Sequence, residues 1–214
     1  MIIDLHTHSL PYSYDSDLTP SEVVELCKQA GLDGVCLTEH DEFWEKQDLI
    51  KLGREHDLLV LPGVELSTDI GHILVFGVDS YAFGMHRAEF VREVVNREGG
   101  FMILAHPYRE KSTHLIFKSS LEELHLNAAF ELVDALEYFN GRSTDRENQI
   151  SRELGERLNL KGSGGSDAHK RGDIPSYATY FDRDIHNLEE LVAELKAGRF
   201  RPVDLRHRGA EKWR

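Results

Sequence analysis

The chain has 214 residues, of which 40% are hydrophobic, and its 38 acidic and 25 basic residues give a formal net charge of −13. This length suits one domain with its own core, and the acidic balance argues against binding to duplex nucleic acid, whose affinity depends on neutralising phosphates. Neither a membrane span nor a secretory leader is recognisable, so we expect a cytoplasmic protein without membrane contacts. Cys27 and Cys36 are predicted to be core thiols rather than a disulfide. The sequence does not indicate an oligomeric state.

Short apolar runs alternate with helical patterns in the first half of the chain. Strands are predicted over residues 2–6, 34–38, 58–65 and 72–78, and helices over residues 20–30 and 41–56. Thr19 and Glu22 form a capping box with Pro20 at the first helical position, which marks the start of the first helix. Because residues 72–78 follow the preceding strand closely, we expect these two strands to form a hairpin.

The same alternation continues in the second half. Helices are predicted over residues 85–98, 121–132, 144–158 and 188–196, and strands over residues 101–107, 135–139 and 178–181, with the glycine-rich segment GSGGSDAH at residues 162–169. About seven strand–helix units indicate a mainly parallel sheet and a compact, irregular α/β barrel. We expect this single domain to cover residues 1–205. The short basic tail at residues 206–214 is interpreted as a frayed end or a subunit contact.

Side chains of the metal-binding types occur where the predicted strands end. They are His6, His8, His40, Glu65, His106, Asp167 and His169. His72 begins its strand, but the hairpin would bring it to the same end of the sheet. Any one of these residues could be an ordinary hydrogen-bonded or loop residue, and it is the joint pattern that predicts a metal centre. The other histidines lie in helical or loop sequence and are expected to play no part in it: His56, His86, His114, His125, His186 and His207.

The residue types in this set narrow the metal and the chemistry. Histidine with carboxylate and without cysteine favours Zn²⁺, Mn²⁺ or Fe²⁺ over Mg²⁺. Eight candidates exceed the needs of one ion, so with an acid from the loop YSYDSD they predict two or three divalent ions. Sites with several metals typically clamp the attacking and leaving oxygens of a phosphoryl displacement.

Five motifs in order, DLHTHS, TEHD, GVE, AHP and GSDAH, resemble those of the polymerase and histidinol phosphatase (PHP) superfamily of metal-dependent phosphoesterases. The resemblance extends from Asp4 to about Phe181. It implies a distorted, TIM-like (β/α)7 barrel and up to three metal ions. It also implies that the first ion is held by His6, His8, Glu65 and Asp167, and that Glu65 bridges to a second ion held by His72 and His106.

The third ion of such a trinuclear site would be held by His40, His169 and an acid that follows the first motif. Asp15 is preferred as this acid because DSDLTP resembles the D-G-x-L-T-P of relatives. Its separation from His8 is longer than is common in the family, so Asp17 remains an alternative, and both aspartates could instead only shape a polar loop.

The resemblance also implies a mechanism. A hydroxide bridging two ions would attack phosphorus, with Glu65 and Asp167 as ligands and His169 or a metal-bound water as the proton donor to the leaving group. Arg109 and Arg142 follow predicted strand ends, where a guanidinium could bind phosphate oxygens. Lys170 and Arg171, which directly follow His169, are further candidates for binding phosphate oxygens.

The expected substrate is a small phosphorylated metabolite or a nucleotide, hydrolysed as a phosphomonoester. A phosphotyrosine phosphatase or an exonuclease-like phosphodiesterase could use the same residues, because the segment between His106 and Asp167 is too short for a large cap. Amidohydrolase-type C–N hydrolysis is a minor alternative, since such sites often use a bridging modified lysine where this chain has Glu65. A non-catalytic binding module would be expected to lack some of the ligands.

Overall fold

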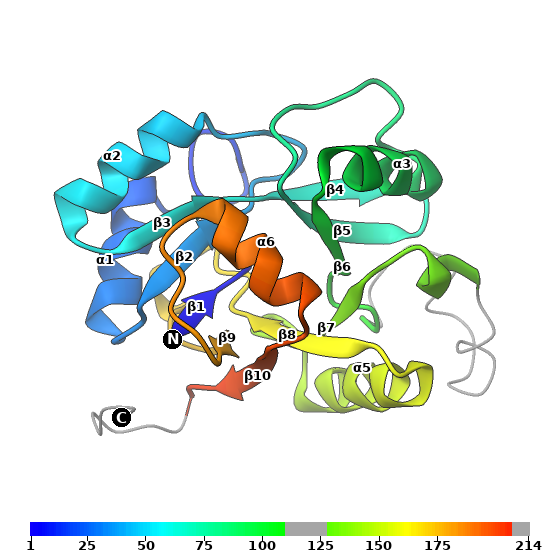
Figure 1. Cartoon of the computed structure of the whole chain (residues 1–214). Helices are drawn as coiled ribbons and strands as arrows, with labels where there is room; N and C mark the ends of the chain where they lie inside the picture. The colour runs from blue at the N-terminus through cyan, green and yellow to red at the C-terminus, as the bar shows by residue number, and fades with distance from the viewer. Residues whose placement is uncertain (110–127, 207–214) are drawn as a thin grey trace.

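The computed structural model describes residues 1–109 and 128–206. These residues form an α/β fold whose strands make two five-stranded sheets (Figure 1). The α/β class and the single domain are therefore confirmed. Most of the helix predicted over residues 121–132 lies outside the described residues. In its described part, Ala128–Glu131 form a short 3-10 helix. Residues 207–214 of the predicted tail also lie outside the described part, so the boundary at residue 205 stays a prediction.

The first sheet has the strand order β10-β9-β1-β2-β3. Its central strand β1 pairs in parallel with β2 and antiparallel with β9, while β3 is parallel to β2 and β10 antiparallel to β9. Its members are β1 (Ile2–Asp4), β2 (Gly34–Leu37), β3 (Leu59–Pro62), β9 (Tyr177–Phe181) and β10 (Phe200–Asp204).

The second sheet follows the chain, in the order β4-β5-β6-β7-β8. Its members are β4 (Val64–Thr68), β5 (Gly71–Phe76), β6 (Phe101–Leu104), β7 (Ala135–Asn140) and β8 (Lys161–Gly165). Strands β4 and β5 form the predicted hairpin, β5 and β6 are also antiparallel, and β6, β7 and β8 are parallel. The described pairings are thus half parallel and half antiparallel, so the expectation of a mainly parallel sheet was wrong.

The two sheets are not one continuous ladder. Between β3 and β4 the chain turns at Gly63, where a Cβ atom would lie 2.7 Å from the ring of Phe76 and 2.8 Å from a methyl of Thr38. On the other side, the Thr179 hydroxyl donates to the Gly164 carbonyl at 2.8 Å and accepts from the Gly164 amide at 2.9 Å. A side chain there replaces the backbone pairing that would join β8 to β9. The predicted strand over residues 58–65 is accordingly two strands, and closure into a barrel is not confirmed.

Single bridges join the sheets beyond the ends of the strands. Thr7, which follows β1, pairs in parallel with Ala168 after β8, and His40 after β2 pairs in parallel with Glu65 in β4. Backbone bonds from Asp167 to the His6 carbonyl (2.8 Å) and from Glu65 to the Glu39 carbonyl (2.9 Å) belong to the same junctions. The fold therefore brings four of the sequence motifs together at one end.

Helices cover the outer faces of both sheets (Figure 1). Helices α1 (Pro20–Gln29) and α2 (Lys46–His56) pack beside β2 and β3, α3 (Ala88–Glu98) beside β6, and α5 (Asp145–Leu158) beside β7 and β8. Helix α6 (Leu188–Lys196) closes the interior between the sheets. Along β5, Ile73 and Val75 pack in the hydrophobic cluster that includes α3, while Leu74 and Phe76 pack in the interior cluster that includes α6. This alternation is the two-residue period of a strand.

Helix starts agree with the sequence where a capping box exists. Thr19 and Thr144 each cap their helix with the expected glutamate three residues later. The helix predicted from residue 41 begins only at Lys46, because Asp41 has a left-handed backbone (φ 56°) that no α-helix contains. The helix predicted from residue 85 begins at Ala88, after an extended Arg87. Cys27 and Cys36 are buried free thiols, as predicted.

Two strands were not predicted. Strand β10 contains Pro202 and charged residues, a composition typical of an edge strand, and it pairs only with β9 in the described sheet. The glycine-rich KGSGG is strand β8, although its composition indicated a loop. Its glycines are needed for packing, because a Cβ on Gly162 would lie 2.1 Å from the ring of Tyr138.

We therefore expect Gly162→Ala to lower the free energy of unfolding by about 1–3 kcal/mol, the usual range for an overpacked core. Urea denaturation measures this change directly. Gly172→Ala is the matched control, because a Cβ on Gly172 would meet nothing within 4 Å and its backbone is not left-handed. Equal stability of the two variants would contradict this account of β8.

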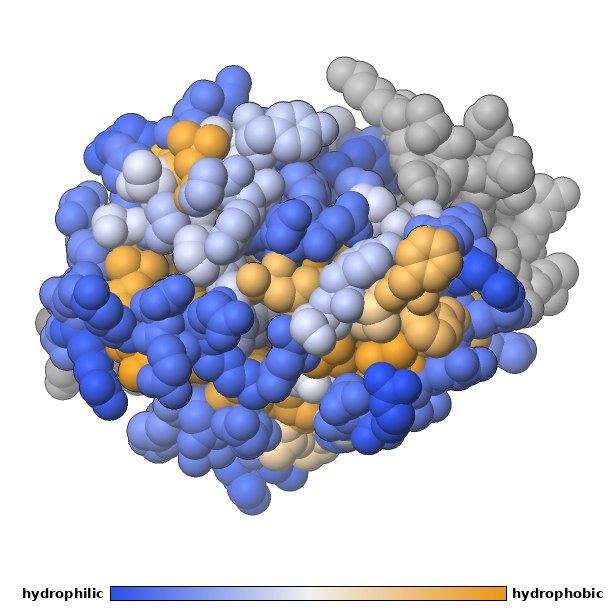
Figure 2. Space-filling view, turned by 90° about the horizontal axis from the view of Figure 1, so that it is seen from above, coloured by the Kyte–Doolittle hydropathy of each residue, from blue (hydrophilic) through white to orange (hydrophobic). Residues whose placement is uncertain are grey.

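The face in Figure 2 is mainly hydrophilic, with hydrophobic side chains showing between hydrophilic ones. The longest described helix, α5, has 14 residues, and none of the described helices is long and apolar enough to cross a membrane.

Candidate metal centre

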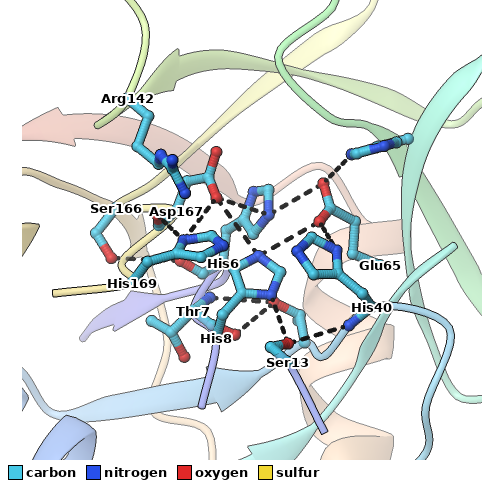
Figure 3. Close-up of polar contacts among 12 residues, drawn as sticks. His6, Thr7, His8, Ser13, His40, Glu65, Arg142, Ser166, Asp167 and His169 are labelled. Atoms are coloured by element: carbon cyan, nitrogen blue, oxygen red, sulfur yellow. Dashed lines mark hydrogen bonds and ion pairs between the residues drawn. The ribbon is translucent and has the colours of Figure 1, made fainter. Parts of the chain in front are cut away.

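The predicted metal ligands gather at the end of the molecule where the single bridges join the sheets (Figure 3). The segments after β1, β2, β6 and β8 and the hairpin of β4 and β5 each contribute to the group. The side chains brought together are His6, His8, Asp15, His40, Glu65, His72, His106, Asp167 and His169. Residues up to 163 positions apart in the sequence thus share one site.

Glu65 lies at the centre of this group and is 1% exposed. Its two carboxylate oxygens together contact five imidazoles. Oε1 lies 3.3 Å from His6 Nε2, 3.0 Å from His72 Nδ1 and 3.0 Å from His106 Nε2. Oε2 lies 3.3 Å from His8 Nε2 and 2.9 Å from His40 Nδ1. This carboxylate therefore faces both halves of the histidine cluster, the position of a bridging ligand.

Asp167 and Asp15 supply two further carboxylates to the histidine cluster. Asp167 Oδ1 lies 3.4 Å from His8 Nε2 and 3.7 Å from His6 Nε2. Asp15 lies 3.1 Å from His169 Nε2 and 3.4 Å from His40 Nε2. The neighbouring Asp17 instead donates its backbone amide to the His169 carbonyl. Of the two acids proposed for the third ion, the structure brings Asp15 to both histidines.

The group has the properties of a metal site. Ligand atoms that share one ion lie roughly 3–3.5 Å apart, and the nitrogen–oxygen distances here run from 2.9 to 3.7 Å. The buried Nε2 atoms of His6, His8 and His169, and Oε2 of Glu65, make no well-formed hydrogen bond within the described residues, although groups of the cluster lie 2.9 to 3.7 Å away. Three sets of side chains have ligand atoms close enough for one ion: His6, His8 and Asp167; His6, Glu65 and His106; and His8, His40 and His169. Burying so many polar atoms without well-formed hydrogen bonds is costly unless a ligand uses them.

Two of the ligand positions have an uncommon backbone conformation. His106 has φ 32° and Asp167 has φ 51°, both in the left-handed region that side-chain-bearing residues rarely adopt. Each follows directly from a strand into a loop. Strained residues of this kind cluster at functional sites, where the surrounding structure holds them.

Burial and charge shift the pKa values of the ligands. Burial alone would lower the pKa of His8, but bonds to Asp167 and Glu65 outweigh it and raise the pKa to about 9. His6 has a pKa well above its usual value, because Glu137, Glu65 and Asp167 outweigh its burial. By contrast, burial and Arg109 lower the pKa of His106, and burial and His8 lower that of His169.

These shifts predict that metal binding releases protons. The raised pKa values of His6 and His8 favour the protonated imidazoles in the metal-free protein, and each must lose one proton to bind an ion. We expect the apparent affinity for Zn²⁺ to rise between pH 6 and pH 8, about tenfold per pH unit for each proton released. Isothermal titration calorimetry in two buffers of different ionisation enthalpy counts the protons. An affinity that does not change with pH would contradict the prediction.

The two predicted phosphate-binding arginines differ in their surroundings. The Arg109 guanidinium donates to Asp167 at 2.7 Å and to Asn140 at 2.8 Å, so it is held against a predicted ligand. Arg142 is exposed, and its side chain lies beside Asp167 and His169 (Figure 3). Arg171 forms an ion pair with Glu22 of α1 instead. Arg142 is thus the arginine best placed to meet a substrate.

Sequence reasoning missed the residues that support the ligands. Glu137 and Asn140 of β7 contact His6, His106 and Asp167. A signal for Glu137 was present, because a charged residue within the apolar run ALEYF has to find buried partners. Of the six histidines set aside, the described ones lie apart: His56 near Glu25, His86 near Phe83 and His186 bonded to Glu190. His114, His125 and His207 lie outside the described residues.

Fold and site together define an α/β protein with a candidate centre for several metal ions. Residues 145–200, which include Asp167 and His169, match a family model described as PHP-associated. Over 119 residues the chain is 29% identical to an uncharacterized protein of Methanocaldococcus jannaschii, covering 50% of this chain and 68% of that protein.

Solved structures share the fold. A two-domain protein of Bacteroides vulgatus, containing a predicted PHP-like metal-dependent phosphoesterase, matches with a TM-score of 0.70 and 19% identity, covering 95% of this chain and 64% of that one. This chain therefore spans somewhat less than two thirds of that protein. An amidohydrolase of Chromobacterium violaceum, with bound sulfate and no metal, matches with a TM-score of 0.65 and 18% identity, covering 96% of this chain and 98% of that one. The resemblance to the PHP superfamily is confirmed for the segment that matches the PHP-associated model, and the solved structures show that the fold is shared.

Proposed function

We propose that this protein is a metal-dependent phosphoesterase that hydrolyses a phosphomonoester of a small metabolite or nucleotide. The observation that carries the proposal is the convergence of nine histidine and carboxylate side chains. In three of these histidines the buried Nε2 atom makes no well-formed hydrogen bond in the described part of the chain and faces carboxylates of the cluster. This donor set suits two or three ions of Zn²⁺, Mn²⁺ or Fe²⁺. The PHP-associated match and the fold of the Bacteroides vulgatus protein support the same class.

The contacts suggest how the ligands divide among the ions. His6, His8, Glu65 and Asp167 would hold the first ion; Glu65, His72 and His106 the second; and Asp15, His40 and His169 the third. When bound, divalent ions in such a site lower the pKa of water toward neutrality and neutralise phosphate oxygens. A shared Glu65 would keep the first two positions adjacent, as in two-metal sites that stabilise the attacking and leaving oxygens of an in-line displacement.

The surrounding side chains of this chain would bind the phosphate. Arg142 can donate two parallel hydrogen bonds to phosphate oxygens. With Nε2 assigned to the third ion and Nδ1 bonded to the Asp167 carbonyl at 2.9 Å, His169 has no proton left for the leaving oxygen, so water would be that donor. Sulfate, which is bound to the related amidohydrolase, has the tetrahedral shape of phosphate.

The similarity to an amidohydrolase favours a second candidate, hydrolysis of a C–N bond. Metal centres of both kinds activate water, so the ligands alone do not separate the two reactions. The exposed Arg142 beside the centre favours phosphate, because a tetrahedral anion gains most from a guanidinium.

A turnover panel tests the choice. Protein purified with Mn²⁺ is assayed for phosphate release from p-nitrophenyl phosphate, histidinol phosphate, nucleoside mono- and bisphosphates and a phosphotyrosine peptide, and for hydrolysis of cyclic amides. We expect phosphate release from at least one monoester, and Arg142→Met to raise its KM roughly 10-fold or more with the metal content unchanged. Hydrolysis of amides alone would move the assignment to the second candidate, and phosphodiester cleavage alone to an exonuclease-like activity.

A further inference from the structure

In three of the predicted ligand histidines the Nδ1 atom bonds a group other than a metal-ligating side chain. His6 Nδ1 lies 2.9 Å from Glu137 Oε1, His8 Nδ1 lies 3.1 Å from the Ser13 hydroxyl, and His169 Nδ1 lies 2.9 Å from a backbone carbonyl. The Nε2 atoms of the same three imidazoles make no well-formed hydrogen bond in the described residues and face carboxylates of the cluster. A neutral imidazole carries one proton, so a proton held on Nδ1 leaves the Nε2 lone pair for a metal.

Glu137 is fully buried and its two oxygens have different tasks. Oε1 accepts from His6 Nδ1, while Oε2 accepts from the backbone amide of His106 at 2.8 Å and from Asn140 Nδ2 at 2.9 Å. The Asn140 amide group cannot turn over, because its Oδ1 accepts from the Arg142 backbone amide at 2.9 Å. Both partners of Oε2 are therefore obligatory donors.

We propose that Glu137 is a positioning residue that keeps the proton of His6 on Nδ1 and so directs the Nε2 lone pair at the metal. The inference rests on the proposed metal-dependent function. The donors around Glu137 determine which way the side chain of Glu137→Gln must turn. In Glu137→Gln the amide oxygen must take the place of Oε2, since two donors face it, and the NH₂ group must then face His6 Nδ1. That imidazole would be forced to carry its proton on Nε2, where it blocks the ion.

A second buried carboxylate provides a contrasting variant. Glu39 Oε2 accepts from the Ser9 amide at 2.8 Å and from the Ser13 hydroxyl, which in turn accepts from His8 Nδ1. Glu39 Oε1 accepts from Ser9 Oγ and Trp44 Nε1. In Glu39→Gln the Ser9 amide, which can only donate, would hold the glutamine oxygen at the position of Oε2. The chain of hydrogen bonds from this oxygen through the Ser13 hydroxyl to His8 therefore survives, and only the bond from Trp44 is lost.

The experiment measures Zn²⁺ affinity by competition with a chelator in wild type, Glu137→Gln, Glu39→Gln and Glu194→Gln. Glu194 is a buried carboxylate remote from the site that pairs with Arg199. We expect Glu137→Gln to bind Zn²⁺ 10- to 100-fold more weakly, Glu39→Gln to lose well under tenfold and Glu194→Gln to lose nothing. Circular dichroism checks that each variant is folded.

A second readout does not need a variant to fold. A long-range ¹H–¹⁵N correlation spectrum of Zn²⁺-loaded, histidine-labelled wild type shows which ring nitrogen of each imidazole carries the proton, and the signal missing in His6→Gln identifies His6. A protonated Nδ1 and a metal-bound Nε2 support the proposal. The reverse tautomer of His6 overturns it. So does a Zn²⁺ affinity of Glu137→Gln that equals that of wild type, or a loss of affinity in Glu39→Gln as large as that in Glu137→Gln. Absence of Zn²⁺ binding in wild type would instead overturn the proposed function.

Discussion

Replacing Glu65 with glutamine is expected to reduce metal-dependent turnover by about 10³-fold or more, roughly 4 kcal/mol of transition-state stabilisation. Residues that only orient a ligand typically cost 10- to 100-fold. Glu65 should exceed that range because both of its oxygens face imidazole nitrogens that are candidates for the same ions. In either orientation, the glutamine NH₂ would point a proton at nitrogens whose lone pairs the ions need.

The measurement combines steady-state kinetics with metal content by mass spectrometry. We expect Glu65→Gln to bind fewer ions than wild type, since the residue would bridge two of them. Glu194→Gln is the control, because it makes the same change at a buried carboxylate outside the site. A Glu65→Gln protein with full metal content and near-normal turnover would exclude a bridging role for this side chain.

Asp167→Asn is expected to have the second largest effect, about 10²- to 10³-fold on turnover, or roughly 3–4 kcal/mol. Asp167 Oδ2 accepts from Arg109 at 2.7 Å and from Asn140 at 3.1 Å, both of which can only donate at this contact. The asparagine oxygen must stay there, so its NH₂ group faces His6 and His8, where Oδ1 now lies. The variant would replace a metal ligand by a donor without changing the volume of the side chain.

Asp173→Asn is the matched control for this prediction. Asp173 accepts from the backbone amides of His169 and Lys170, both at 2.9 Å, through one oxygen. An asparagine oxygen can accept the same two bonds, so we expect a loss of less than tenfold. If the two asparagine variants lost turnover equally, the effect of Asp167→Asn would have to be attributed to the loop rather than to metal binding. Unfolding curves of both variants separate stability from activity.

Helix starts and hairpins were predictable from the sequence where the residues that form them lie close together in the chain. The capping boxes at Thr19 and Thr144 are formed because a hydroxyl and a glutamate three residues apart satisfy amides within one turn. The hairpin of β4 and β5 follows from the short connection between two apolar runs. KGSGG was missed as a strand because the ring that needs its glycines belongs to Tyr138, on a neighbouring strand.

The sequence by itself determined the chemical type of the site. Histidines and acids follow successive apolar runs, and strand ends gather at one end of an α/β fold, so it could be predicted without coordinates which side chains come together there. Only the tertiary structure decided that Asp15 rather than Asp17 faces His40 and His169, that Arg109 is bound to Asp167 while Arg142 is exposed, and that Glu137 bonds His6. Those relations join residues far apart in the chain through single hydrogen bonds, whose direction and distance no sequence spacing records.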